Sequence, residues 1–211
     1  MASKILVDEL APQSHATDVT ITTGKKIAGA NTQYKVTGGA SGQILTNDGS
    51  DGLSWSAAPP VVTKRAVLCE QQAAGTVGGT FTSGAWQIRT LNNEVYDDIG
   101  ISISTNVFTI PAGTFYIRWA APANKVNSHM TRLYDITNTA VVEYGTTGRD
   151  DAGAYASNNT SEGFAKVTPS GSTEYRIEHR CETTQASNGF GEMSNFGEVI
   201  KYTVVELVQT V

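Results

Sequence analysis

The sequence predicts an all-β fold, and three observations support that expectation. Only 17% of the 211 residues are charged, against roughly a quarter in ordinary globular proteins, while Gly accounts for 21 residues. Much of the polarity comes instead from Thr, Ser and Asn, which suit turns and strand surfaces better than helix interiors. Apolar residues alternate with the two-residue period of strands, and no long window has a helical repeat.

Residues 1–60 are predicted to form an extended N-terminal arm. Apolar residues there are sparse and are separated by turn signals such as Thr37-Gly38-Gly39 and Asn47-Asp48-Gly49. So little apolar surface cannot offset the conformational entropy of ordering a small domain. We therefore expect the arm to gain its order from other chains. Ala57-Ala58-Pro59-Pro60 is the predicted stiff spacer after it.

Residues 61–211 are long enough for a hydrophobic core and predict about eight to ten strands in a two-sheet sandwich or jelly roll. One strand shows the alternation clearly. Its two faces are Tyr175, Ile177, His179 and Cys181 on one side, and Arg176, Glu178, Arg180 and Glu182 on the other. The final segment, Tyr202–Val208, is apolar on both faces. It is therefore predicted to be a central strand whose outer face meets another subunit.

Charge and composition exclude several classes of protein. The net charge is −5 and basic residues never run beyond two, which argues against nucleic-acid binding. No apolar stretch is long enough to span a bilayer, and the apolar stretch near the start is too short for a signal peptide, so we expect synthesis in the cytoplasm of the producing cell. Cys69 and Cys181 are expected to be free buried thiols, with a single bridge as the alternative.

Catalytic and metal-binding motifs are missing from the sequence, and we expect neither enzyme activity nor a cofactor. There is no Gly-x-Ser-x-Gly, no phosphate-binding loop and no His-Glu-x-x-His. His15, His129 and His179 are isolated, and His179 is expected to be a core residue. The acidic pairs Asp97-Asp98 and Asp150-Asp151 are interpreted as turn residues and solvated charges rather than calcium ligands.

A recognition surface is predicted on the stretch Thr146–Ser161, interpreted as a long loop on a rigid sandwich. Its Tyr and Asn side chains suit contact with a saccharide or a protein. The candidate residues are Arg149, Tyr155, Asn158 and Asn159. Asn188-Gly189-Phe190-Gly191 is a second candidate loop. For the charges of Arg176 to Glu182, pairing with neighbouring strands or subunits and a solvated outer face both stay open.

The segment Val107–Ile117 resembles the C1q/tumour-necrosis-factor-like signature, with an aromatic residue, Pro111 and Gly113 at a tight turn, and an alternating aromatic strand. The resemblance extends over about residues 64–211, although the usual Asn-Gly turn is replaced by Asp135-Ile136-Thr137-Asn138-Thr139. It implies a ten-stranded jelly roll that assembles as a tight homotrimer. The trimer contacts that it implies are Phe115, Tyr202, Val204 and Leu207.

The arm has a resemblance of its own. Gly38–Gly49 followed by Leu53-Ser54-Trp55 looks like a short module of phage tail-fibre and appendage proteins, and Ser3–Asp8 is similar to the start of fibre-like proteins of marine and cyanobacterial phages. The module reads physically as a β-hairpin, with Gln43–Thr46 paired to the returning Leu53–Trp55.

Together, the two resemblances imply a non-enzymatic protein of the phage virion. In the first interpretation the arm anchors a trimeric knob to other virion proteins, and the knob contacts a host-surface glycan or protein. In the second the chain is a capsid decoration or cement protein that stabilises the head. The third, a glycan depolymerase, is disfavoured because no groove with paired carboxylates is evident.

Overall fold

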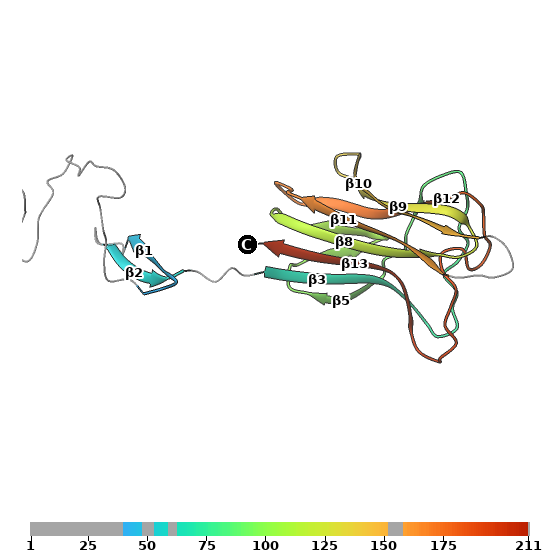
Figure 1. Cartoon of the computed structure of the whole chain (residues 1–211), viewed down its shortest axis with the longest axis horizontal. Coiled ribbons are helices and arrows are strands. Elements are labelled where there is room, and N and C mark those ends of the chain that lie inside the picture. The colour runs from blue at the N-terminus through green and yellow to red at the C-terminus, as the bar shows by residue number, and fades with distance from the viewer. Residues whose placement is uncertain (1–39, 48–52, 59–62, 152–157, 211) are drawn as a thin grey trace, which may run out of the picture. The chain divides into compact units, whose positions relative to one another are not determined.

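A computed structural model describes residues 40–47, 53–58, 63–151 and 158–210 (Figure 1). The chain divides into two units, Met1–Pro59 and Pro60–Val211. Most of the expected arm lies outside the described residues, as do His15 and Tyr155.

The first unit contains the hairpin that its sequence predicts. β1 (Gln43–Asn47) pairs antiparallel with β2 (Leu53–Ala57), and Leu45 lies opposite Trp55. The hydroxyls of Thr46 and Ser56 are 3.1 Å apart across the pair. Gly42 precedes β1 with a φ of 83°, a conformation that favours glycine.

The second unit is built from eleven strands, and every pairing between them is antiparallel. They are β3 (Thr63–Gln72), β4 (Gln87–Ile88), β5 (Asn93–Asp97), β6 (Ser102–Ser104), β7 (Val107–Ile110), β8 (Thr114–Ala123), β9 (Asn127–Asp135), β10 (Ala140–Asp150), β11 (Asn159–Val167), β12 (Thr173–Cys181) and β13 (Ile200–Thr210).

These strands form two sheets. One has five strands in the order β11-β8-β13-β3-β5. The other has six strands: β10-β9-β12-β7-β6 in order, and the two-residue β4, which also pairs with β12. Successive strands cross repeatedly between the sheets, as in a jelly roll. The described residues contain no helix, and so none that could cross a membrane. The all-β jelly roll expected from the sequence is confirmed.

The core lies between the two sheets and follows the alternation of the strands. In β8, Phe115, Ile117 and Trp119 are buried, while Tyr116 and Arg118 face outward. β13 lies between β8 and β3 (Figure 1), so the prediction of a central final strand is confirmed.

One close approach in the core requires glycine. A Cβ atom at Gly163 of β11 would lie 1.9 Å from the Trp119 ring, which packs over that backbone. The ring is fixed in turn, because its Nε1 donates a hydrogen bond to the Thr131 hydroxyl at 2.7 Å. No side chain fits at position 163 unless Trp119 moves.

A smaller apolar cluster closes one end of the sandwich. Phe81, Ala123, Val126 and Cys181 are buried there, and Phe190 packs on them with its ring 4.3 Å from that of Phe81. Both cysteines of the chain are free and buried, as expected. Burial raises the pKa of the Cys181 thiol to about 11, so this side chain is protonated at neutral pH.

Candidate functional surfaces

Two buried histidines were candidates for chemistry, and their surroundings indicate a packing role. His129 Nδ1 and His179 Nε2 lie 2.9 Å apart, on the paired strands β9 and β12. Burial, with Arg89 and His129 close by, lowers the pKa of His179 well below its ordinary value. The expected core position of His179 is confirmed. Among the described residues, no group of three or more His, Cys, Asp or Glu side chains is placed to hold a metal ion.

Two of the outward charges that begin at Arg176 form ion pairs within the chain, and the other two are exposed. Glu178, whose side chain is 3% exposed, accepts a hydrogen bond from Arg132 Nε at 2.5 Å and from Arg176 Nε at 2.8 Å. The Arg132 guanidinium also lies 4.2 Å from the centre of the Trp86 ring. These contacts stiffen the outer face of one sheet. Arg180, near the end of β12, and Glu182, just after it, are exposed.

The outer face of the other sheet has a different character. We call it the β13 face and define it by the outward residues of β8, β11 and β13: Tyr116, Arg118, Ala120, Glu162, Phe164, Lys166, Val204, Glu206 and Val208. Phe164 is 60% exposed and its ring stacks against Tyr116 with 6.0 Å between centroids. Val204 and Val208, on the central strand, are half-buried. The β13 face is therefore a partly apolar surface that no other described element of the second unit covers.

Two ion pairs lie on or beside the β13 face. Arg118 Nη2 is 3.2 Å from Glu162 Oε2, and Arg65 Nη2, on the neighbouring β3, is 3.9 Å from Glu206 Oε1. All four side chains are substantially exposed, so the pairs contribute little to the stability of a single chain. They do give the surface alternating charge that another copy can match.

Three of the four implied trimer contacts are buried inside the chain. Phe115 and Leu207 have no exposed surface, and Tyr202 is 6% exposed with its hydroxyl donating to the Thr76 carbonyl at 2.7 Å. Of the four, only Val204 lies on the β13 face and retains exposure. Phe115 and Leu207 have the strand parity that points into the sandwich, so they are core residues and cannot meet another subunit while the sandwich is closed.

The predicted recognition loop is shorter than the sequence suggested. β10 continues to Asp150 and β11 begins at Asn159, so half of Thr146–Ser161 is strand. Arg149 is exposed on β10, opposite Ser128. Asn159 opens β11, opposite Ala123.

Asn158 and the second candidate loop have structural partners. The Asn158 side chain accepts a hydrogen bond from Glu192 N at 2.8 Å and donates to Glu192 O at 3.2 Å. In the second loop, Phe190 is packed in the apolar cluster and Asn188 Nδ2 donates to Glu192 Oε2 at 2.5 Å. These side chains fix the segment before β13 to the sandwich. Of the described candidates, Arg149 and Asn158 are exposed and Asn159 is half-buried.

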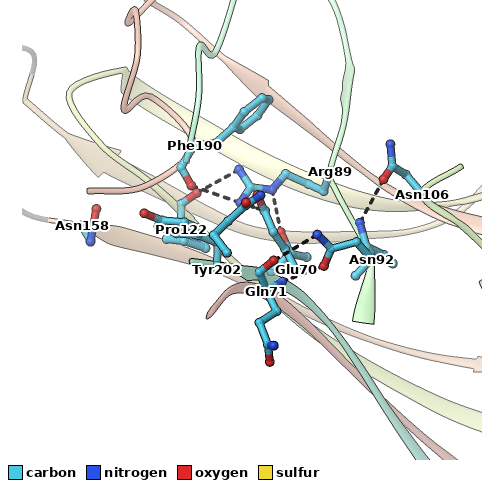
Figure 2. A network of polar contacts seen from close by, with 12 residues as sticks. Glu70, Gln71, Arg89, Asn92, Asn106, Pro122, Asn158, Phe190 and Tyr202 are labelled. Atoms are coloured by element: carbon cyan, nitrogen blue, oxygen red, sulfur yellow. Dashed lines mark hydrogen bonds and ion pairs between the residues drawn. The ribbon is translucent and has the colours of Figure 1, made fainter. Parts of the chain in front are cut away.

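Sequence reasoning missed a buried polar network around Arg89 (Figure 2). Arg89 has no exposed surface, and its Nε donates to the Thr203 hydroxyl at 2.7 Å. Its Nη2 lies 3.1 Å from the Phe190 carbonyl and 3.4 Å from Glu70 Oε2, while Nη1 is 3.4 Å from the Pro122 carbonyl. One guanidinium thus joins β3, β8, β13 and the Phe190 loop.

Burial dominates the electrostatics of this network. It lowers the pKa of Arg89 to about 10 even though Glu70 opposes the change, and it raises the pKa of Glu70 in spite of Arg89. No pattern in the sequence indicates it: the alternation of Trp86 and Ile88 predicts that Arg89 faces outward, yet Arg89 is buried and Ile88 is 42% exposed. The network therefore links strands inside the fold, and its buried Arg89 and Glu70 side chains are not accessible to a ligand.

Comparisons with known proteins find remote likenesses among solved structures. No protein-family model matches the sequence, and no curated protein matches it. Among solved structures, the globular domain of zebrafish complement 1qA protein is 15% identical, with 69% of this chain and 94% of that chain covered and a TM-score of 0.42. Murine APRIL at pH 8.5 is 6% identical, with 70% and 99% covered and a TM-score of 0.45. Murine APRIL at pH 5.0 is 8% identical, with the same coverage and a TM-score of 0.44. The jelly-roll topology of the larger unit rests on the strand order of its two sheets and not on these likenesses.

Proposed function

We propose that this chain is a non-enzymatic structural and adhesive protein of a phage particle. Its jelly roll is a knob that assembles as a homotrimer through the β13 face, and its N-terminal arm anchors the knob to other virion proteins. The observation that carries the proposal is the β13 face itself. A central strand with Val204 and Val208 half-buried on its outward side is typical of a surface that another subunit covers.

The charges on the β13 face support self-association over contact with a strongly charged partner. Glu162, Arg118 and Glu206 on this face, together with Arg65 on the adjoining β3, alternate in sign from one strand to the next. Rotation about a threefold axis brings different parts of one face together in successive copies, so a surface carrying both signs is able to complement itself. Phe164, exposed beside these charges, supplies the apolar area that such an interface buries.

The assignment to a virion rests on the arm. The segment Gly38–Trp55 resembles appendage modules, and its β1–β2 hairpin has few apolar residues of its own to bury. Such a hairpin is marginal alone and gains stability when a partner covers it. In this proposal the exposed knob contacts the host surface. Capsid decoration is the second candidate function, because an arm of this composition also suits a capsid surface.

Sedimentation of the purified full chain tests the assembly. The wild type is expected to sediment as a trimer of its 22.4 kDa chain, and Val204→Asp as a monomer, because a buried unpaired carboxylate is costly at an interface. Ser102→Asp, an exposed position on the opposite sheet, is the matched control and should remain trimeric. A wild-type monomer at micromolar concentration would refute the proposed trimer.

Imaging of labelled particles tests the location. Labelled chain is expected at the tail or neck if it is a fibre, and over the head in proportion to the capsid subunits if it is a decoration protein. Purified particles that lack the chain altogether would refute both virion functions.

A further inference from the structure

The β9–β10 turn, Asp135-Ile136-Thr137-Asn138-Thr139, forms one wall of a polar pocket. We call it the Asp135 pocket, a hollow of about 480 Å³ between the β9–β10 turn and the β11–β12 loop. Its size suits a small ligand. We propose that the Asp135 pocket binds a neutral sugar residue of a glycan. This inference rests on the proposed adhesive function and names the ligand class that the knob would recognise.

Backbone hydrogen bonds hold both walls of the pocket in place. On one side Ile136 N donates to the Glu174 carbonyl at 2.9 Å, and Glu174 N donates to the Thr137 hydroxyl at 3.0 Å. On the other side Gly113 N donates to the Pro169 carbonyl at 3.0 Å. A ligand therefore meets walls that are already ordered, which lowers the entropy cost of binding.

The polar groups of the pocket match what sugar hydroxyls need. The Asp135 carboxylate, 8% exposed, accepts one bond at each oxygen from Asn138, from its backbone N at 2.8 Å and from its Nδ2 at 2.9 Å. Each oxygen retains a further lone pair for a ligand hydroxyl. Beside it, burial and the Asp135 charge raise the pKa of Tyr175 to about 12, so its phenol stays a neutral donor.

The remaining lining residues indicate whether the pocket suits neutral or acidic sugars. It consists of small hydroxyl side chains together with Val142, Val167 and Pro169, which suit the C–H surface of a sugar ring. Its one charged group at neutral pH is Asp135, and the lining has no Lys, Arg or His to hold a carboxylate, sulfate or phosphate. The pocket therefore favours neutral sugars and repels acidic ones.

Saturation-transfer NMR with the full chain tests the inference. The probes are glucose, galactose, mannose, fucose and N-acetylglucosamine, with glucuronic acid and N-acetylneuraminic acid as the acidic comparison. At least one neutral sugar is expected to bind in the millimolar range, more tightly than either acidic sugar. Binding by none of the neutral sugars, or preference for an acidic one, would overturn the proposal.

Three variants locate the binding. Asp135→Asn removes the charge-assisted acceptor and is expected to weaken binding about tenfold or more. Ser172→Trp, at an exposed position of the rim, fills the hollow and should abolish binding even if Asp135→Asn folds poorly. Glu94→Gln, an exposed carboxylate on the other sheet, is the matched control and should bind as the wild type does. Unchanged binding in both pocket variants would place the sugar elsewhere and sink the inference.

The experiments distinguish failure of the pocket inference from failure of the proposed virion function. If particles that carry the chain attach to cells through the knob while the isolated chain binds no neutral sugar, the pocket inference is wrong and the adhesive function stands. If the chain binds neutral sugar through the Asp135 pocket but is missing from particles, the virion function is wrong and the pocket stands.

Discussion

Replacing Arg89 by Met should destabilise the knob strongly, because the change leaves a buried charge without its partner. Met keeps most of the apolar stem but removes all four polar contacts of the guanidinium. Glu70, 2% exposed, then has no cation beside it, and the carbonyls of Pro122 and Phe190 lose a donor. Removing one member of a buried ion pair typically costs about 3–5 kcal/mol. We expect a loss of that order in the free energy of unfolding, measured by urea titration with tryptophan fluorescence at a fixed protein concentration.

Two further variants separate the charge effect from a general loss of packing. Arg89→Met combined with Glu70→Leu removes both charges and should recover much of the lost stability, to within about 2 kcal/mol of the wild type. Arg118→Met breaks an exposed pair and should change stability by less than about 1 kcal/mol. The reasoning is refuted if Arg89→Met alone unfolds within about 1 kcal/mol of the wild type, or if adding Glu70→Leu makes it worse.

Two other predictions concern the core. Burial lowers the pKa of His179 well below its ordinary value of about 6.5, so below that pH the unfolded chain binds more protons than the folded chain. The free energy of unfolding should therefore fall as the pH drops below about 6.5, by up to about 1.4 kcal/mol per pH unit. The fall should be less steep in His179→Gln. A flat profile between pH 7 and 5 would contradict this. Gly163→Val should cost about 1–3 kcal/mol or more and shift the tryptophan emission, since its side chain displaces Trp119, whereas Gly171→Val, with open space around it, should be tolerated. Equal thermal stability of the two valine variants would contradict this prediction, because it would mean that the Trp119 ring moves aside at little cost in free energy.

Strand alternation made much of the jelly roll predictable. Tyr175, Ile177 and Cys181 form one buried face of β12, as their spacing predicts. The apolar character of both faces in Tyr202–Val208 correctly predicted a central strand. These successes depend on local periodicity, which a single sequence displays directly.

The same periodicity cannot say which face of a doubly apolar strand points inward. Leu207, on the doubly apolar β13, is such a case and lies in the core. Phe115 also lies in the core; the family resemblance implied it as a trimer contact, although the alternation of β8 places it on the inward face. Arg89 is a harder case, because its burial depends on Glu70 and Thr203, residues far apart in the sequence. The extension of β10 to Asp150 was missed because its pairing with β9 is interrupted by two register shifts, and a polar, Gly-containing strand resembles a loop.

The position of β13 has a consequence for how the knob folds. β3 and β8 do not pair with each other, and each forms its hydrogen bonds to β13, which is synthesised after both. In the pairing of β13 with β3, Thr210 lies opposite Thr63, so residues from nearly opposite ends of the unit meet. A nascent chain without β13 has two open strand edges at the centre of its sheet, and such edges invite pairing with foreign chains. Maturation of the knob therefore waits on insertion of its last strand, and shortened translation products should aggregate rather than accumulate as partly folded monomers.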